Sequence, residues 1–452
     1  MRMSHTRNTC ARTHPTQEEA RLAGLVAEHD VVVSLVPAPC HPPIAKLAIA
    51  AGKHMVTASY ISPEMAALSK AAEAAGVTIL NEAGLDPGID HMSAKKLIDD
   101  AVAAGGTIVG FSSVCGGLPA PEAANNPLGY KFSWSPRGVL TASRNTAHFL
   151  RDGVEVNVPG ESLLASATPF RVNPAFSLEV LPNRDAVPYA EKYGIASPRL
   201  RTMYRGTLRY AGYSSHMQTL AGLGLLSLEP VEVPRGTTMA DLLRSAVHAP
   251  AGADADTVFA AVVAHAAGSA RAAVGTHVAA LRALSPALAD AAAAGAAVCS
   301  NVAVDSNPLR AAELRAFLEW AGFFNTAAYA PLRGAAAGNG VTTPALETVV
   351  AAEAAAGGVV SGTVTHVPLD TLVAVLTSKP EMSYAKGERD MALMQHDLEV
   401  EYADGRRAVH TSTLVEYADV ARKQTAMSRT VGLTAAIGAQ IILDGALCWG
   451  AG

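Results

Sequence analysis

The stretch NEAGLDPGIDHM places two aspartates, a proline and two glycines at the end of a short apolar strand. Pro87 disfavours the helical region at Asp86, and Gly88 allows the backbone to turn sharply after it. Asp86 is therefore predicted to lie on a rigid loop, with Asp90 capping a helix that begins at His91. Such a loop at the carboxyl end of a parallel strand is a usual ligand-binding position, although a lone D-P-G sequence is more often a plain turn.

Two further polar residues follow the preceding apolar strand, in the sequence VTASYISPEM. Ser59 and Tyr60 leave that strand much as Asp86 leaves the next one. Because parallel strands present their carboxyl ends at one edge of a sheet, these three side chains are predicted to converge there. This convergence favours a binding or catalytic site over a plain turn.

Cys115, in VCGGLPAPE, is a candidate of a different kind. It is either a small buried hydrophobic residue or a site residue, since the two glycines that follow let a ligand approach the backbone closely. The middle of the chain also carries cations on predicted loops and strand ends. Each is typical of a surface charge, but a substrate with several carboxylates needs two or three of them, preferably arginines. They are Lys131, Arg137, Arg184, Arg205 and Arg209.

The elements that must position Asp86 alternate between strand and helix patterns. Strands are predicted at 30–37, 53–59 and 76–84, and helices at 16–28, 43–51 and 63–75. Strands joined by helical crossovers pair in parallel. The predicted fold class is therefore α/β, with an incomplete doubly wound, Rossmann-like parallel sheet. No G-x-G-x-x-G follows a predicted strand, so the half that carries the phosphate-binding turn is predicted to be missing.

After about residue 106 the sequence changes to strands and loops rich in Gly, Pro and polar residues, which predicts an α+β domain. The sequences MALMQHDLEVEY and RRAVHTSTLVEY, separated by ADG, predict a β-hairpin. A closing helix is predicted at 424–443. The predicted domains are a truncated dinucleotide-binding domain (1–92), an α+β domain (93–235 and 358–423), an alanine-rich helical insertion (236–357) and a C-terminal helix that returns toward the nucleotide domain (424–452).

Composition excludes several classes of protein. The net charge is −5, and no basic cluster with interleaved aromatics is present, which argues against a nucleic-acid partner. No stretch of about 18 residues is predicted to span a membrane. Neither the five cysteines nor the histidines show metal-ligand spacing, so no metal site is predicted. A small-molecule partner and a cytoplasmic location are expected, with the mitochondrion as the alternative because the N-terminus is rich in Arg, Ser and Thr.

Several longer motifs together resemble the saccharopine dehydrogenase family of the glutamate-forming type, also called saccharopine reductase. They are NEAGLDPGIDHMSAKKLID, CGGLPAPEAANNPLGYKFSWSPRGVL, PNRD, RGTLRY, and KGERDM followed by HTSTLVEY. The resemblance implies a nucleotide-binding domain, an α+β domain for substrate binding and dimerisation, and a small helical domain. It also implies a homodimer that interconverts saccharopine, NADP or NAD and water with L-glutamate and 2-aminoadipate 6-semialdehyde in lysine metabolism.

The matching motifs also imply roles for residues of this chain. Those that resemble cofactor contacts are Ser34, Leu35, Val36, Pro37, Ala58, Ser59, Leu85, Asp86 and Pro87, with Ser135 reaching the cofactor from the second domain. Those that resemble contacts to saccharopine or glutamate are Ser59, Tyr60, Asp86, Arg184, Gly206, Thr207 and Leu208. Asp86, Cys115 and Tyr60 would surround the secondary amine of the substrate. Asp86 is assigned the role of accepting the proton of this amine, and water or Cys115 could share that proton transfer.

The chain departs from the family pattern at both ends. Family members begin with a βαβ unit that bears the pyrophosphate loop, and they continue past the equivalent of residue 445. Because a helix N-terminus and backbone donors normally hold the pyrophosphate, weak cofactor binding is expected without them. Two functions therefore stay open at this point: an active oxidoreductase, and a catalytically weak or silent truncated homologue that binds substrate or a second subunit.

Overall fold

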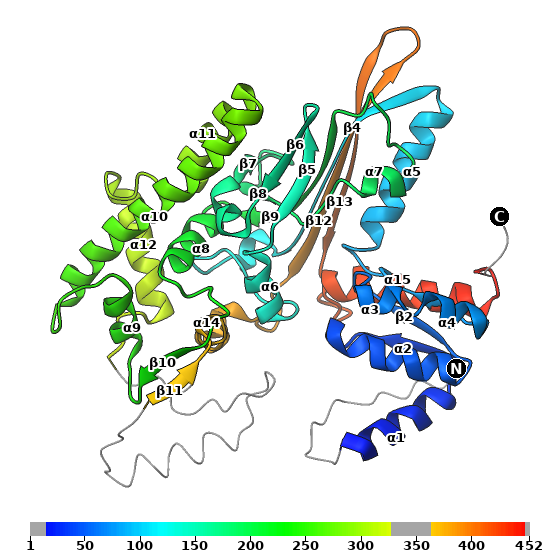
Figure 1. The fold of residues 1–452 in the computed structure, drawn as a ribbon, viewed down its shortest axis with the longest axis horizontal. Helices are drawn as coiled ribbons and strands as arrows, with labels where there is room; N and C mark the ends of the chain where they lie inside the picture. The colour runs from blue at the N-terminus through cyan, green and yellow to red at the C-terminus, as the bar shows by residue number, and fades with distance from the viewer. Residues whose placement is uncertain (1–14, 327–362, 448–452) are drawn as a thin grey trace. The chain divides into compact units, whose positions relative to one another are not determined.

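The structure, a computed structural model, describes residues 15–326 and 363–447 (Figure 1). Its contacts divide the chain into two compact units. Unit 1 comprises Met1–Lys95 and Ala426–Gly452, and unit 2 comprises Lys96–Thr425. The alanine-rich insertion is described only up to residue 326, and the first fourteen residues lie outside the described part. The finer domain boundaries that the sequence suggested stay predictions.

Unit 1 contains a three-stranded parallel sheet, so the predicted α/β fold is confirmed. In spatial order its strands are β1 (Val31–Ser34), β2 (His54–Thr57) and β3 (Ile79–Leu80). The last residues of β1 and β2, Ser34 and Thr57, lie opposite each other in the register. The three strands therefore end at one edge of the sheet. β3 is much shorter than the predicted strand, because the chain leaves the sheet early to form the loop that carries Asp86.

Helices surround this small sheet. They are α1 (Pro15–Ala27), the 3-10 turn η1 (Ala38–Cys40), α2 (His41–Ala50), α3 (Pro63–Ala66), α4 (Ser69–Ala74) and α15 (Ala426–Leu443). Helix α5 (Ile89–Ala103) begins in unit 1 and continues into unit 2. The single helix predicted at 63–75 is in fact two short helices. Ser62 starts the first of them, because its hydroxyl accepts a hydrogen bond from the backbone N–H of Met65.

Both faces of the sheet in unit 1 are covered. Successive residues of a strand point to opposite faces, so Met55 packs against α1, α2 and α3 while Val56 packs against α15. The two cores comprise Val26, Ala45, Ala48, Met55 and Met65 on one face, and Val56, Ala83, Ala435, Ala439 and Ile442 on the other. Gly438 lets α15 approach closely, since a Cβ at this position would lie 2.8 Å from Cδ2 of Leu80.

Unit 2 is built on an eight-stranded sheet of spatial order β13-β12-β4-β9-β5-β6, in which β8 also pairs with β9 and β7 with β8. The strands are β4 (Gly106–Pro119), β5 (Ala147–Arg151), β6 (Val154–Val158), β7 (Thr168–Phe170), β8 (Leu178–Pro182), β9 (Thr202–Tyr210), β12 (Asp390–Tyr402) and β13 (Arg407–Tyr417). β4 and β9 pair in parallel, and the other pairs are antiparallel. β12 and β13 form the hairpin predicted from the ADG turn.

Helices and a second, two-stranded sheet complete unit 2. The helices are α6 (Pro136–Ala142), α7 (Tyr189–Lys192), α8 (Tyr213–Gly222), α9 (Met239–Ala246), α10 (Ala255–Leu284), α11 (Pro286–Cys299), α12 (Pro308–Ala321) and α14 (Pro368–Thr377), with 3-10 turns η2 (Pro121–Ala123), η3 (Gly160–Ser162), η4 (Leu164–Ser166) and η6 (Pro380–Met382). The small sheet pairs β10 (Val231–Pro234) with β11 (Thr363–His366). The helical pattern predicted within 236–357 is observed in α9 to α12.

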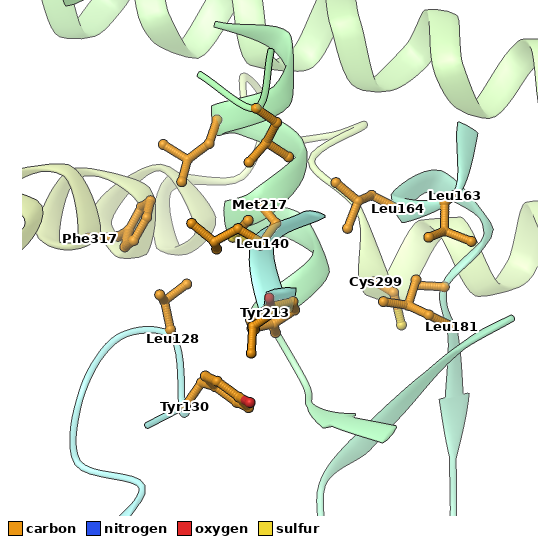
Figure 2. Close-up of a cluster of buried hydrophobic side chains, with 14 of the residues drawn as sticks. Leu128, Tyr130, Leu140, Leu163, Leu164, Leu181, Tyr213, Met217, Cys299 and Phe317 are labelled. Atoms are coloured by element: carbon orange, nitrogen blue, oxygen red, sulfur yellow. The ribbon is translucent and has the colours of Figure 1, made fainter. Parts of the chain in front are cut away.

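One large apolar core joins the eight-stranded sheet to the alanine-rich helices. Figure 2 shows part of it: Leu163, Leu181 and Cys299 lie on one side of Tyr213, and Leu128 and Phe317 lie on the other. The alanine-rich helices therefore pack on the sheet through a shared core.

Two helices, α10 and α15, are long and apolar enough to cross a membrane by length and composition alone. Helices in the core of a folded protein meet the same criterion. Val262 and Ala266 of α10 are buried in the core of unit 2, and Ala439 of α15 is buried against the sheet of unit 1. Both helices thus pack one side against protein.

Candidate functional site

The edge of unit 1 brings together two of the predicted site residues. The phenolic O–H of Tyr60, which follows β2, donates a hydrogen bond to Oδ1 of Asp86, which follows β3, at 2.5 Å. Backbone hydrogen bonds continue the sheet toward this pair, from the N–H of Ala83 to the carbonyl of Thr57 and from the N–H of Glu82 to that of Ser59. The two strand ends therefore converge as the parallel arrangement predicts.

The loop around Asp86 is closed on itself by the backbone. The N–H of Gly84 donates to the carbonyl of Pro87 at 3.0 Å, and the N–H of Ile89 donates to the carbonyl of Gly84 at 2.9 Å. Gly88 has a φ of 145°, and a Cβ there would lie 2.1 Å from the oxygen of Gly84. Only glycine fits this crossing, so the loop holds Asp86 in one place.

The predicted helix start after this loop was wrong by two residues. Helix α5 begins at Ile89, and Asp90 already lies in its first turn. The carboxylate of Asp90 is buried and accepts a hydrogen bond from the N–H of Gly88 at 2.6 Å. Asp90 therefore caps the loop from inside the helix, where a negative charge is favoured by the helix dipole. Nδ1 of His91 lies 3.4 Å from Oδ2 of Asp90, and its Nε2 lies 3.3 Å from Oε2 of Glu82.

Sequence reasoning missed His41, which ties the ends of β1 and β2 together. Its Nδ1 lies 2.9 Å from Oγ of Ser34, and its Nε2 lies 2.9 Å from Oγ of Ser59 and 3.1 Å from Oγ1 of Thr57. Burial lowers the pKa of His41, so the imidazole is held neutral. The signal in the sequence was a histidine that opens a helix directly after the first predicted strand end, in PAPCHPP.

The other predicted cofactor contacts of unit 1 differ in exposure. Leu35 is 63% exposed at the end of β1, and Pro37 is also exposed, whereas Val36 and Ala58 are half-buried. Ser34 and Leu85 are each only 4% exposed. Ser34 and Leu85, like the buried Pro87, therefore pack inside this edge of the sheet. The exposed Leu35 and Pro37 are the positions where a ligand could be contacted.

Four of the predicted site residues of unit 2 lie at the centre of its sheet: Cys115, Gly206, Thr207 and Leu208. Cys115 of β4 lies opposite Thr207 of β9, which in turn lies opposite Leu181 of β8. Cys115 is 6% exposed, Gly206 and Leu208 are buried, and Thr207 is half-buried. Among these positions Thr207 therefore offers the most accessible side chain.

Arg184 follows β8 and is held by its own backbone. Its φ is 53°, in the left-handed region that non-glycine residues rarely adopt. The carbonyl of Arg184 accepts a hydrogen bond from the N–H of His148 at 2.8 Å, and the N–H of the preceding Asn183 donates to the carbonyl of Arg205. The backbone thus holds Arg184 beside β9 while its side chain is exposed. Such strain at a non-glycine residue is typical of functional positions.

Ser135 lies in unit 2 at the start of α6. Its hydroxyl accepts a hydrogen bond from the N–H of Gly138 at 3.2 Å, which makes it the N-cap of that helix. This structural role accounts for a serine here, and its assignment as a cofactor contact stays a prediction.

The cations singled out in the sequence fall into two groups. Arg137 and Arg184 are exposed, and Arg137 pairs with Asp370 at the surface. The other three are buried: Lys131, Arg205 and Arg209. Lys131 pairs with Glu388 at 2.7 Å, and this hydrogen bond lowers the pKa of Glu388. Among the described residues no group of three or more His, Cys, Asp or Glu side chains is arranged to hold a metal ion.

Comparisons with known proteins agree with this architecture. The family model described as the saccharopine dehydrogenase NADP binding domain matches residues 2–80, and the saccharopine dehydrogenase C-terminal domain matches residues 84–451. The chain belongs to the saccharopine dehydrogenase family. This confirms the resemblance carried by the sequence motifs.

Individual members of the saccharopine dehydrogenase family are similar over most of the chain. A saccharopine dehydrogenase [NADP(+), L-glutamate-forming] from Pyricularia oryzae is 37% identical over 95% of this chain and 80% of the relative. A mitochondrial alpha-aminoadipic semialdehyde synthase from Mus musculus is 50% identical over 47% of this chain and 23% of that protein. The structure of apo saccharopine dehydrogenase (L-Glu forming) from Saccharomyces cerevisiae is similar with a TM-score of 0.67 and 32% identity, covering 96% of this chain and 80% of that one.

Replacing Gly88 tests whether the closed loop positions Asp86 in this member of the saccharopine dehydrogenase family. Gly88→Ala is expected to lower the free energy of unfolding by about 3 kcal/mol or more, because its Cβ would overlap Gly84. Gly76→Ala is the matched control: Gly76 has a φ of 64°, but a Cβ there would meet no atom within 4 Å. That control is expected to cost about 1–2 kcal/mol. Equal losses in urea unfolding of the two variants would contradict this view of the loop.

The burial of His41 makes the stability of unit 1 dependent on pH. The unfolded chain protonates this histidine near its ordinary pKa, about 6.5, while the folded state resists protonation. Below that pH the unfolded state binds more protons, so stability is lost as the pH falls. His41→Ala should lower the free energy of unfolding by about 2 kcal/mol at neutral pH and weaken the loss in acid. Urea unfolding at several pH values measures both effects, and an unchanged pH dependence would contradict the assignment.

Proposed function

We propose that this chain is an NADP-dependent oxidoreductase of lysine metabolism, which interconverts saccharopine, NADP+ and water with L-glutamate, 2-aminoadipate 6-semialdehyde, NADPH and a proton. The observation that carries the proposal is the Tyr60–Asp86 hydrogen bond at the carboxyl edge of a parallel sheet, in a chain of the saccharopine dehydrogenase family. The NADP-binding description of the matching domain favours NADP over NAD. A cytoplasmic location is part of the proposal, with the mitochondrion, named for animal relatives, as the alternative.

The edge of unit 1 fits a dinucleotide cofactor in its chemistry. Leu35 offers exposed apolar surface after β1, and Ser59 and Tyr60 offer hydroxyls after β2, at the carboxyl ends of parallel strands. Val36 and Pro37 after β1, and Ala58 after β2, would line the same edge. When bound, NADP+ supplies the acceptor for a hydride.

Asp86 is proposed as the group that takes the proton from the substrate. Saccharopine carries a secondary amine, and the amine must lose its proton before the neighbouring carbon can give up hydride. A carboxylate within hydrogen-bond reach performs this step as a general base. The O–H of Tyr60 donates to Oδ1 of Asp86, which orients the carboxylate. Cys115 stays a candidate for sharing this step, but its thiol is buried in the middle of a sheet.

Unit 2 is proposed to bind the carboxylates of the substrate. Saccharopine has three carboxylates and glutamate has two, so cationic and hydroxyl donors are required. Arg184 presents an exposed guanidinium on a strained backbone, and Thr207 presents a hydroxyl at the centre of the sheet. The backbone of Gly206 and Leu208 flanks Thr207 on the same strand, as substrate contacts predicted from the family motifs.

Replacing the polar pair at the edge of unit 1 tests the proposed reaction. The purified chain should form NADPH from saccharopine and NADP+, followed by absorbance. Asp86→Asn should lower kcat by about 10²–10⁴-fold, the usual contribution of a general base, and Tyr60→Phe should lower it less. Asp30→Asn, at a surface aspartate whose side chain is 86% exposed in the same unit, is the matched control and should keep full activity. A wild-type chain that neither binds NADPH on titration nor forms it would contradict the proposal.

A homodimer is proposed to form through β13. Among the described residues β13 pairs only with β12, which leaves a long strand edge open. Exposed edges of this kind pair with a second chain unless charges or prolines block them. With a two-fold axis at Ser412, an antiparallel pair of β13 strands would place Val409 opposite Val415 of the second copy. These are exposed apolar residues, at 63% and 37%, so the register buries them against each other.

A charge on β13 tests this dimer. Val409→Lys would place an ammonium group opposite an apolar partner twice in the symmetric interface, so it should shift the protein to monomers in sedimentation or light scattering. Val298→Lys, at an exposed valine of α11, is the control and should leave the dimer intact. A Val409→Lys protein that stays dimeric at the concentration where the wild type does would contradict the β13 interface.

A further inference from the structure

Arg209 of β9 is a buried cation whose charge no described carboxylate neutralises. It is 7% exposed, and its guanidinium carbon lies 5.0 Å from the ring centre of Tyr130 and 5.2 Å from that of Tyr213. One terminal nitrogen donates to the carbonyl of Leu208 at 2.9 Å, but Nε has no hydrogen-bond partner in the described part of the chain. Buried charges are normally paired, because burial without a partner is strongly unfavourable.

The acid opposite Arg209 in the sheet is committed elsewhere. Glu179 of β8 lies across from Arg209 in the register and is fully buried. Its carboxylate accepts hydrogen bonds from the backbone N–H groups of Gly212 at 3.1 Å and Ser214 at 2.6 Å, at the start of α8. Burial raises the pKa of Glu179. Lys131 has Glu388 as its partner, whereas no acid of the described residues forms an ion pair with Arg209.

A small hollow opens directly onto Arg209. Its volume is about 20 Å³, which is enough for one water-sized group such as a carboxylate oxygen. Tyr213 also lines it, is 2% exposed, and has a hydroxyl with no hydrogen-bond partner among the described residues. The remaining polar residues of the lining are Ser143, Asn145, Asn183 and Thr207. A guanidinium, a phenol, two amides and two hydroxyls together form a set of donors suited to an anion.

We propose that this hollow binds one carboxylate of the amino-acid substrate, with Arg209 and Tyr213 as its buried donors. The proposal rests on the function proposed above for the identity of that substrate. Two positions connect the hollow to the predicted substrate contacts: Thr207 lines it directly, and Asn183 precedes Arg184 in the chain. The carboxylate would accept hydrogen bonds from Nε of Arg209 and from the hydroxyl of Tyr213, and it would neutralise the buried charge.

Tyr213→Phe is the sharpest test, because it removes a hydroxyl that has no partner and keeps the ring against Arg209. The variant should unfold at the wild-type temperature without ligand. L-Glutamate should raise the unfolding temperature of the wild type but not that of Tyr213→Phe. The KM for saccharopine should rise at least tenfold with kcat nearly unchanged, as expected for a binding contact. A variant with wild-type KM and wild-type stabilisation by glutamate would overturn the proposal.

Arg209→Gln extends the test, with Arg199→Gln as its matched control. Arg199 is an exposed arginine of the same unit that pairs with Glu401. Only the Arg209 variant should lose the response to glutamate, and a loss shared by both would overturn the proposal. If sodium chloride stabilises the wild type as much as sodium glutamate does, the hollow is a halide site and the proposal is also overturned. A third outcome separates this site from the proposed function. If glutamate stabilises the wild type but not Tyr213→Phe, and the wild type shows no NADP-dependent activity, the proposed function is contradicted and this site is supported.

Discussion

Parallel pairing of β1, β2 and β3 is the constraint on which the candidate site of unit 1 depends. Parallel strands run in one direction, so each of them must end at the same edge of the sheet. Residues far apart in the sequence, such as Tyr60 and Asp86, are thereby brought within hydrogen-bond distance. The same pairing brings Ser34 and Thr57 to the imidazole of His41, which holds together the ends of two strands of only four residues each.

Much of this arrangement could be predicted because it depends on local patterns. Short apolar strands separated by helical stretches specify a parallel sheet, and the ADG turn specifies the hairpin of β12 and β13. The errors lie where backbone geometry overrides pattern. β3 is short because the chain turns at the crossing of Gly84 and Gly88, and α5 starts early because Asp90 can cap that crossing from within the helix. Neither contact can be predicted from the spacing of apolar residues in the sequence.

Buried polar groups were the hardest part to predict. A lone histidine or arginine in a sequence is most often exposed, and only the packed chain shows which ones are enclosed. His41 acquires its partners from the ends of two strands, and Arg209 acquires its tyrosine neighbours from a loop and from the start of α8. Sequence motifs had drawn attention to Arg209 as one of five cations but could not separate it from Arg137, which pairs at the surface.

The packing of α15 on β2 has a consequence for how the protein is made. One face of the first sheet, with Val56 and Ala83, is covered by α15, which follows unit 2 in the sequence. During synthesis on the ribosome this apolar face must wait, uncovered, until residues 426–443 have emerged. Domains generally fold as units while the chain is still growing, and unit 1 cannot. Its strands are therefore the part of the nascent chain that a chaperone has the longest opportunity to bind.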